Sequence, residues 1–228
     1  MIACTVQPCK VLILEGTSGV GKSTLIDALL RRHVAGCASR KIRSILHLAQ
    51  SHTYGPLARA EDDGTLTVAQ NLVHLNRIAS HLEWFHASVQ EHDRPWAFAI
   101  LDTLHLTHCV RPGTVAWPDV ASIDARLAAL GAKLLLLEVQ PSTLWHRSIV
   151  PRLNDQFMLE YARKFGRSNE EIHAYFVREQ EELRELFDRS AMLKLRLDAD
   201  QSVETLAGRA YQYWTGEPES AQSSKPRP

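Results

Sequence analysis

The chain has 228 residues, enough for one α/β domain with a substantial core and too few for two such domains joined by a linker. Its 26 basic and 26 acidic side chains cancel, so no overall field draws the protein toward nucleic acid or a membrane surface. Cys4, Cys9, Cys37 and Cys109 lack metal-ligand spacing and are too few for a disulfide-stabilised scaffold. We therefore expect reduced thiols in a cytoplasmic protein with no membrane partner.

Short apolar segments alternate with longer amphipathic ones along most of the chain. This order is typical of β-α units around a mostly parallel sheet. Strands are predicted at residues 11–15, 42–49, 97–102, 133–139 and 193–197. Helices are predicted at residues 23–33, 68–92, 122–130 and 169–189. We expect a three-layer α/β/α fold, with a five-stranded, mostly parallel sheet and helices on both of its faces.

Residues 1–214 are expected to form a single domain. The helix at 169–189 should begin after Ser168, because Ser168 and Glu171 match a capping box, in which each side chain satisfies a backbone N–H. We interpret the charges along this helix as a solvated face without a functional role. Residues 215–228 are rich in proline, serine and charge, which predicts a disordered tail because little apolar surface is present to bury.

The segment VLILEGTSGVGKST, residues 11–24, contains the full P-loop pattern between a predicted strand and a predicted helix. In such a loop, backbone N–H groups surround the β-phosphate of a nucleotide, next to the positive end of the following helix. Lys22 would reach the β- and γ-phosphate oxygens, and Ser23 would ligate Mg²⁺. The predicted nucleotide-binding residues are Gly16, Thr17, Ser18, Gly19, Val20, Gly21, Lys22, Ser23 and Thr24.

Other classes of P-loop protein fit the sequence less well. The chain contains no Asn-Lys-x-Asp segment of the kind that selects guanine, and no LSGGQ-like segment of the transporter ATPases. It is also too short for a motor protein with a second lobe. Of these classes of P-loop protein, a small kinase is the one that fits the sequence.

Five segments resemble the thymidylate kinase branch of the nucleoside and nucleotide kinases, in the same order along the chain. LEGTSGVGKST is similar to (F/I)EGxDGxGKST, and HTYGPLAR to GGTPLGE. LVHLNRIASHLEW resembles LLFAADRAQHLEE, and AFAILDTLHLTH stands in the place of VICDRYxxS. LDADQSVETLAGRAYQYW is similar to IDAxQSxEEV, a closing strand, loop and helix. The resemblance extends over about residues 11–214 and implies a P-loop NTPase fold with phosphotransferase activity.

The resemblance also implies particular site residues. It places a mobile lid at about residues 145–170, in which Arg147 and Arg152 would close over the transferred phosphoryl group. Arg77 matches a phosphate-contacting arginine, and DADQSVET matches a loop that surrounds the adenine of ATP. A homodimer formed through helices is a further implication. The remaining lid cations are Arg163, Lys164 and Arg167.

Three substrate-side positions depart from the family pattern. Ser18 replaces an aspartate in the loop, and Thr103 replaces an arginine after the third strand. Gln50, Ser51 and His52 replace the sequence Arg-Glu-Pro after the second strand. The sequence therefore predicts a nucleoside monophosphate or nucleoside-like acceptor and does not select thymidylate.

Asp102 ends the predicted strand AFAILD, where it should face the P-loop across the edge of the sheet. A carboxylate there can hold Mg²⁺ directly or through water. Transfer to a hydroxyl also needs a group that accepts the proton, whereas a phosphate acceptor is already ionised. Either the acceptor is a phosphate, or Asp102, Glu15 or His52 acts as the base. The predicted catalytic residues are Lys22, Asp102, Arg147 and Arg152, and the predicted metal ligands are Ser23 and Asp102.

Four residues are predicted to contact the acceptor, namely Arg77, Tyr54, His52 and Arg111. Tyr54 could stack on a planar acceptor, and Arg111 in CVRPG is placed to touch an acceptor phosphate. His105 and His108 are interpreted as polar lining, because their spacing alone does not make side chains converge on a metal.

The predicted function is an ATP- and Mg²⁺-dependent kinase of a small acceptor. Three alternatives stay open, which are a kinase of a non-nucleotide hydroxylated metabolite, a kinase of nucleic-acid ends, and an ATP-dependent switch without an acceptor. The balanced charge counts against nucleic acid, since each phosphate contact needs its own cation. A switch would have no need of lid arginines or of Arg77.

Overall fold

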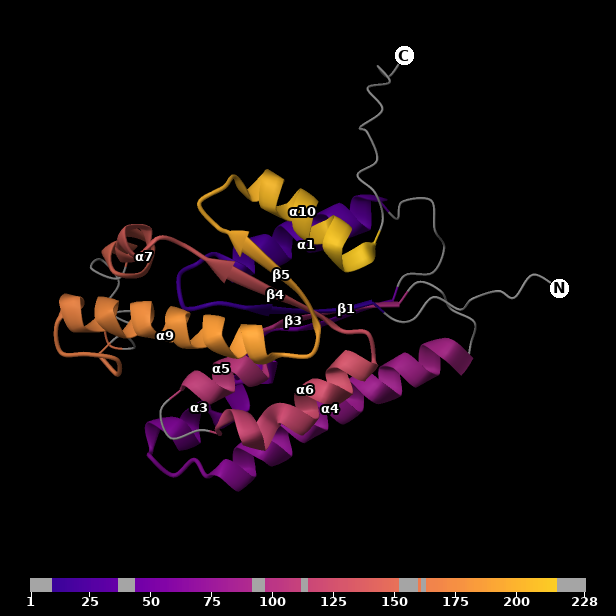
Figure 1. The fold of residues 1–228 in the computed structure, drawn as a ribbon, viewed down its shortest axis with the longest axis horizontal. Coiled ribbons are helices and arrows are strands. Elements are labelled where there is room, and N and C mark those ends of the chain that lie inside the picture. Colours follow the sequence, from indigo (N-terminus) through magenta and orange to yellow (C-terminus); the bar gives the residue numbers. More distant parts are fainter. Residues whose placement is uncertain are drawn as a thin grey trace, which may run out of the picture.

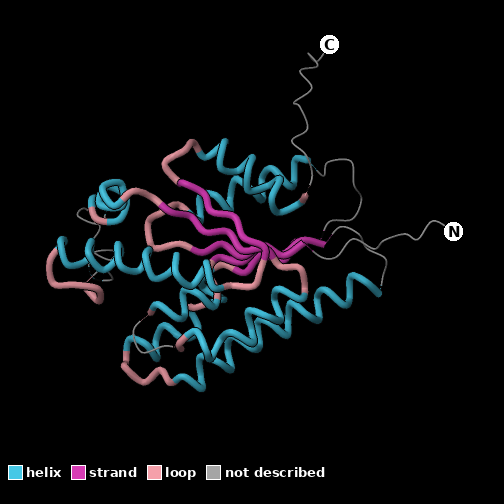
Figure 2. Tube along the Cα trace, in the orientation of Figure 1, coloured by secondary structure: helices cyan, strands magenta, loops and turns pink. Residues whose placement is uncertain are grey.

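The computed structural model describes residues 10–36, 44–91, 97–111, 115–151, 160 and 163–216. A central sheet lies between helices that cover both of its faces (Figure 1, Figure 2). The strands are β1 (Lys10–Glu15), β2 (Ser44–Leu48), β3 (Ala97–Asp102), β4 (Lys133–Glu138) and β5 (Leu193–Asp198). The helices are α1 (Lys22–Gly36), α2 (Gln50–Thr53), α3 (Gly55–Asp62), α4 (Val68–Glu91), α5 (His105–Val110), α6 (Trp117–Ala129), α7 (Pro141–Ser148), α9 (Asn169–Arg189) and α10 (Val203–Thr215).

The sheet has the order β2-β3-β1-β4-β5, and every adjacent pair is parallel. In the central strand, Ile13 lies opposite Leu101 of β3 and Leu134 of β4. Because all strands point the same way, their carboxyl ends meet at one edge. In open sheets of this kind ligands bind outside that edge, where successive connections turn to opposite sides. Here β3 and β4 lie on either side of β1, which places the loop after β1 at this position.

Each face of the sheet is covered by its own hydrophobic cluster. Val11 and Ile13 of β1 pack with α4, α5, α6 and the second half of α9. Leu12 and Leu14 pack with α1, α7, α10 and the first half of α9. Helix α9 therefore contacts both clusters, and Figure 1 shows it running along the sheet between the two layers of helices.

The predicted fold class is confirmed, and the predicted strands agree with β1–β5 to within one or two residues. Helix α6 begins at Trp117 rather than at residue 122. Its first turn contains Pro118, which suits that position, and the Asp119 carboxylate accepts a 2.9 Å hydrogen bond from the Ala116 N–H. The short helices α2, α3, α5 and α7 were not predicted, since segments of one or two turns carry little periodicity.

The predicted tail begins later than expected, and part of the predicted lid lies outside the described residues. Helix α10 continues through Thr215 and ends at Gly216 with φ of 68°, so residue 215 is not part of a tail. Residues 217–228 and Arg152 lie outside the described residues.

The capping box predicted at the start of α9 forms in part. The Ser168 side chain accepts a hydrogen bond from the Glu171 N–H as predicted, but the Glu171 side chain accepts one from the Arg167 N–H rather than from the Ser168 N–H. No helix in the described ranges is long and apolar enough to cross a bilayer.

Candidate active site

The loop between β1 and α1, residues 16–21, packs closely against two other segments. Gly16 has φ of +151°, and a Cβ atom there would lie 2.8 Å from the Leu137 carbonyl oxygen. Gly19 has φ of +89°, and a Cβ atom there would lie 2.3 Å from Ser148 Oγ. The Ser148 hydroxyl donates a 2.7 Å hydrogen bond to the Ser18 carbonyl. Both positions therefore require glycine, and the loop is held against the end of β4 and against α7.

Lys22 is the first residue of α1, and its side chain folds back over the loop. Its ammonium group donates to the carbonyl oxygens of Gly16, at 2.6 Å, and Thr17, at 3.1 Å. Burial lowers the pKa of Lys22, and the nearby charges of Asp102 and Glu179 oppose this shift. The Lys22 ammonium group therefore lies between the loop and the carboxylates of Asp102 and Glu179.

Asp102 ends β3, and its carboxylate is buried, with 6% of the residue exposed. The hydroxyls of Thr53 and Thr103 both donate to its backbone carbonyl at 2.7 Å, but Oδ1 has no hydrogen-bond partner among the described residues. Burial raises the pKa of Asp102, and Lys22 and then His47 counteract the shift. A buried carboxylate oxygen without a partner is costly and suits a site that receives a ligand.

The backbone turns sharply directly after Asp102. Thr103 has φ of 61°, a conformation that is unfavourable for a β-branched residue. Its N–H donates a 2.8 Å hydrogen bond to the Leu14 carbonyl, which holds the turn against β1. The turn directs the chain into α5 along the edge of the sheet. The backbone strain at Thr103 therefore lies directly beside Asp102, the candidate catalytic residue.

The residues around Asp102 fit a magnesium ion. Ser23 and Thr24 expose hydroxyl groups at the start of α1, and both residues line the same cavity as the free oxygen of Asp102. The described residues contain no group of three or more His, Cys, Asp or Glu side chains suited to a metal. Mg²⁺ commonly binds through one or two protein oxygens, with phosphates and water completing the shell, so Ser23 and Asp102 would be enough to hold it.

Two cavities meet at the P-loop, and Gly19, Gly21 and Thr24 line both of them. The larger cavity has a volume of about 840 Å³ and contains Lys22 and Asp102. The smaller cavity, about 410 Å³, lies between the loop, α7 and the segment that joins β5 to α10. Its lining includes Leu137, His146, Arg147, Ala199, Gln201 and Leu206.

Tyr54 and Arg111 line the larger cavity, as their predicted role requires. Both are buried, with 4% and 7% of the residue exposed. The Arg111 guanidinium carbon lies 5.2 Å from the centroid of the Tyr54 ring and 5.4 Å from that of Phe165. The two rings hold a planar cation at the cavity wall.

Helix α9 brings a carboxylate to this cavity that the sequence analysis did not identify. Glu179 is 4% exposed, and it accepts a hydrogen bond from the Thr17 hydroxyl of the P-loop. Its Oε1 lies 3.6 Å from Arg111 Nε. The interpretation of the α9 charges as a solvated face is therefore wrong for Glu179. The signal was present, because Glu179 interrupts a buried apolar stripe at helical spacing, formed by Ile172, Phe176, Leu183 and Phe187.

The structure does not bring Arg77 or His52 to this cavity. On α4 the buried face contains Leu75, Ile78 and Leu82, so Arg77 points to the surface, where it lines a shallow depression. His52 is exposed and contacts its neighbour Ser51 through Nδ1, at 3.3 Å from the hydroxyl oxygen. In α2 the cavity is lined by Gln50 and Ser51 instead.

The predicted lid cations occupy different places. Arg147 belongs to helix α7 and lines the smaller cavity, with Nη1 3.5 Å from the Val20 carbonyl and Nη2 3.4 Å from Asp200. Lys164 lines the larger cavity and pairs with Asp62 at the end of α3. Arg163 and Arg167 are exposed. Arg147 and Lys164 therefore line different cavities, and Arg163 and Arg167 are not among the residues that line either one.

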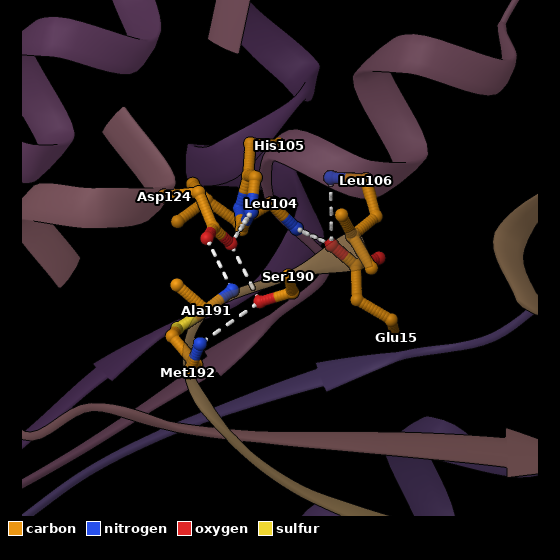
Figure 3. A network of polar contacts seen from close by, with 8 residues as sticks. All are labelled: Glu15, Leu104, His105, Leu106, Asp124, Ser190, Ala191 and Met192. Atoms are coloured by element: carbon orange, nitrogen blue, oxygen red, sulfur yellow. Dashed lines mark hydrogen bonds and ion pairs between the residues drawn. The ribbon is translucent and has the colours of Figure 1, made fainter. Parts of the chain in front are cut away.

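Glu15, one of the three candidate bases, is occupied by the backbone of α5. Its Oε1 accepts hydrogen bonds from the N–H groups of Leu104, at 2.9 Å, and Leu106, at 3.2 Å (Figure 3). Its Oε2 accepts one from the Thr107 hydroxyl at 2.6 Å. Burial raises the pKa of Glu15, and the Thr107 hydrogen bond opposes the shift. Glu15 thus anchors the start of α5 to the end of β1.

His105 and His108 do not converge on one point. His105 Nε2 lies 2.9 Å from Asp124 Oδ1, in a buried network that Figure 3 shows. His108 contacts Thr53 and Asn71 at 3.1 and 2.6 Å. Both side chains connect α5 to neighbouring elements within the protein interior.

Comparison with solved structures shows the fold. No protein-family model matches the chain, and no curated protein matches its sequence. The YorR protein of Bacillus subtilis, in complex with phosphorylated GDP, is similar with a TM-score of 0.53 and 17% identity, covering 88% of this chain and 92% of its own. A gluconokinase from Sinorhizobium meliloti 1021 is similar with a TM-score of 0.50 and 13% identity, covering 90% and 91%. The chain shares the α/β fold of these proteins over nearly its whole length.

Proposed function

We propose that this protein is an ATP-dependent kinase that transfers the γ-phosphoryl group to a nucleoside monophosphate or nucleoside-like acceptor, as a P-loop phosphotransferase similar to the thymidylate kinases. The observation that carries the proposal is the pair of cavities that meet at one P-loop. A protein that only senses a nucleotide needs one such cavity. Direct transfer needs a donor and an acceptor held side by side, because positioning supplies much of the rate.

We assign the base and sugar of ATP to the smaller cavity. Its walls come from α7 and from the segment joining β5 to α10, and Arg147 is the cation among its lining residues. The phosphates would then extend over the loop toward Lys22. Phosphate oxygens would replace the carbonyls of Gly16 and Thr17 as the partners of the Lys22 ammonium group.

We assign the acceptor to the larger cavity. The acceptor oxygen attacks the γ-phosphorus while the bond to the ADP oxygen breaks, and Lys22 stabilises the charge on the transferred group. Mg²⁺, held by Ser23 and Asp102, would neutralise phosphate charge when it is bound. For a hydroxyl acceptor, Asp102 is the favoured base, because Glu15 is occupied by α5 and His52 lies outside the cavity.

The similar structures widen the choice of acceptor to be tested. One of them holds a phosphorylated guanine nucleotide, and the other is named a gluconokinase. A shared fold does not select between such substrates. A panel of acceptors should therefore include nucleosides, nucleoside monophosphates and polyhydroxylated acids.

A coupled ADP-release assay over this panel tests the proposal. We expect at least one acceptor to raise ADP release about tenfold or more above the acceptor-free rate, because acceptor binding completes the site. Short oligonucleotides in the same assay test the nucleic-acid alternative. Slow ATP hydrolysis that no acceptor accelerates would contradict the kinase assignment and favour the switch.

A further inference from the structure

We propose that Glu179 determines the acceptor preference of this site, selecting molecules that present a neutral hydroxyl to the P-loop over molecules that present a phosphate. The inference rests on the proposed kinase function and narrows its acceptor class. It assigns a specificity role to a residue of α9 rather than of the P-loop.

Glu179 lies where the P-loop and Arg111 come together. One carboxylate oxygen accepts from the hydroxyl of Thr17, the second residue of the loop, and the other lies 3.6 Å from Arg111 Nε. Thr17 and Glu179 are both buried, with 1% and 4% exposed, so water does little to screen the charge. The carboxylate therefore stands between the phosphate-binding loop and Arg111, on the side from which the acceptor approaches.

Glu179 also offsets the positive charge of Arg111. An isolated buried arginine would attract an acceptor phosphate, since its fork of donors matches phosphate oxygens. With a carboxylate 3.6 Å away, the pair presents a dipole instead of a net positive charge. The cavity also contains the cations Lys22 and Lys164 and the carboxylates of Asp102 and Glu61, so Glu179 brings the charges of the lining into balance and removes a net attraction for phosphate. An unfavourable charge placed beside a binding group is a common means of rejecting a wrong substrate.

The hydrogen-bonding groups of the larger cavity also favour a hydroxyl acceptor. A hydroxyl both donates and accepts, and Glu179 beside Arg111 offers an acceptor next to a donor. Gln50, Thr103 and Thr107 add further groups of both kinds to the wall. The cavity thus complements a neutral hydroxylated group better than an anion.

The test compares kcat/KM for matched acceptors in wild type and variants. Each pair consists of a hydroxyl compound from the ADP-release screen and the same compound phosphorylated on that hydroxyl, such as thymidine and thymidine 5′-monophosphate. We expect wild type to favour the hydroxyl compound by about tenfold or more. Glu179→Gln keeps the shape and removes the charge, and should lower this ratio by about tenfold, with a lower KM for the phosphorylated partner.

Two further variants separate charge from folding. Glu179→Asp keeps the charge, so its ratio should stay within about threefold of wild type even if turnover falls. Glu182→Gln removes an exposed charge from the same helix and should change neither kcat/KM value. Thermal unfolding of each variant confirms that the fold is retained, and the wild-type and Glu179→Asp ratios decide the question if Glu179→Gln does not fold.

A wild-type preference for the phosphorylated partner, or an unchanged ratio in folded Glu179→Gln, would overturn the inference and leave the kinase assignment standing. Absence of acceptor-stimulated ADP release in wild type would contradict the kinase assignment, and the inference with it.

Discussion

Asp102 carries a buried charge that the described residues satisfy only in part. Its Oδ1 lacks a hydrogen-bond partner among them, and its principal opposite charge is Lys22, which itself folds over the P-loop. Such an arrangement costs stability in a free protein. It is useful only if a ligand, a metal ion or a transferred proton meets that oxygen during the reaction.

Asp102→Asn is therefore expected to lower kcat by about 10²–10³ without loss of folding. The amide has the same shape but neither takes the proton nor neutralises a metal. Steady-state turnover of the best acceptor measures the effect, and Asp27→Asn, on the exposed side of α1, is the matched control. Turnover near that of wild type would remove Asp102 from the catalytic residues.

Lys22→Ala tests the donor side separately. Loss of the ammonium group removes a cation from the transferred phosphoryl group, so kcat should fall by about 10²–10³. Lys194→Ala, at the far edge of the sheet where the side chain donates to the Asp188 carbonyl, should be active. Equal activity of the two variants would contradict the proposed role of Lys22.

His108 makes stability depend on pH. Burial lowers its pKa from 6.5 to about 3, so the folded protein holds the ring neutral while the unfolded chain binds a proton between these values. The neutral ring makes its full contribution to the free energy of unfolding above about pH 6.5. As the pH falls toward 3 this contribution is lost, and the free energy of unfolding decreases by up to about 1.4 kcal/mol per pH unit. The His108 Nδ1 lies 2.6 Å from Asn71 Oδ1 and its Nε2 lies 3.1 Å from the Thr53 carbonyl, and a neutral ring donates its one N–H to only one of these oxygens.

Urea unfolding at about pH 5 and pH 7 measures this dependence. The free energy of unfolding should fall less between the two pH values in His108→Gln than in wild type, because the variant lacks the titrating ring. The other titrating groups are common to both proteins. Identical changes in the two proteins would show that His108 is not held neutral by burial.

At the scale of elements, α5 is fixed by carboxylates at both of its sides. Glu15 of β1 holds its first turn, and Asp124 of α6 accepts from the Ser190 hydroxyl and from the Ala191 N–H while contacting His105 (Figure 3). Burial raises the pKa of Asp124, but the hydrogen bonds of His105, Ser190 and Ala191 outweigh it and leave the pKa lowered. This network connects α5 and α6 to the turn between α9 and β5.

Asp124→Asn should destabilise the protein by about 2–4 kcal/mol, because it removes a buried charge from partners that stay in place. Urea denaturation measures the loss. Since Arg111 directly follows α5, the acceptor KM should rise more than the ATP KM. A loss below about 0.5 kcal/mol would mean that the network does not hold α5.

The elements also show why sequence predicts some parts of this site and not others. Buried parallel strands such as KLLLLE are continuous apolar runs, so their limits are visible, and the P-loop lies where the strand and helix around it require. Whether a polar side chain on a helix points to the interior or to solvent depends on which face of the helix packs against the rest of the protein. Arg77 interrupts a largely apolar helix and Glu179 interrupts the apolar stripe of a charged one, yet Glu179 is buried against Arg111 and the P-loop, while Arg77 points outward. These contacts join residues far apart in the chain, which a local pattern does not contain.

At the scale of the whole molecule, one loop is shared by two cavities with different walls. α7, α10 and the end of β5 surround the smaller cavity, and α2, α3, α5 and α9 surround the larger one. Helix α9 touches both hydrophobic clusters and carries Glu179 to the loop. In the proposed mechanism both substrates occupy these cavities at once, and the phosphoryl group passes directly between them.

Initial velocities measured over a matrix of ATP and acceptor concentrations test this claim most directly. Direct transfer requires a ternary complex, so double-reciprocal plots at several acceptor concentrations should intersect. Parallel lines, together with a phosphorylated enzyme formed from ATP alone, would indicate a covalent intermediate and contradict the two-cavity account.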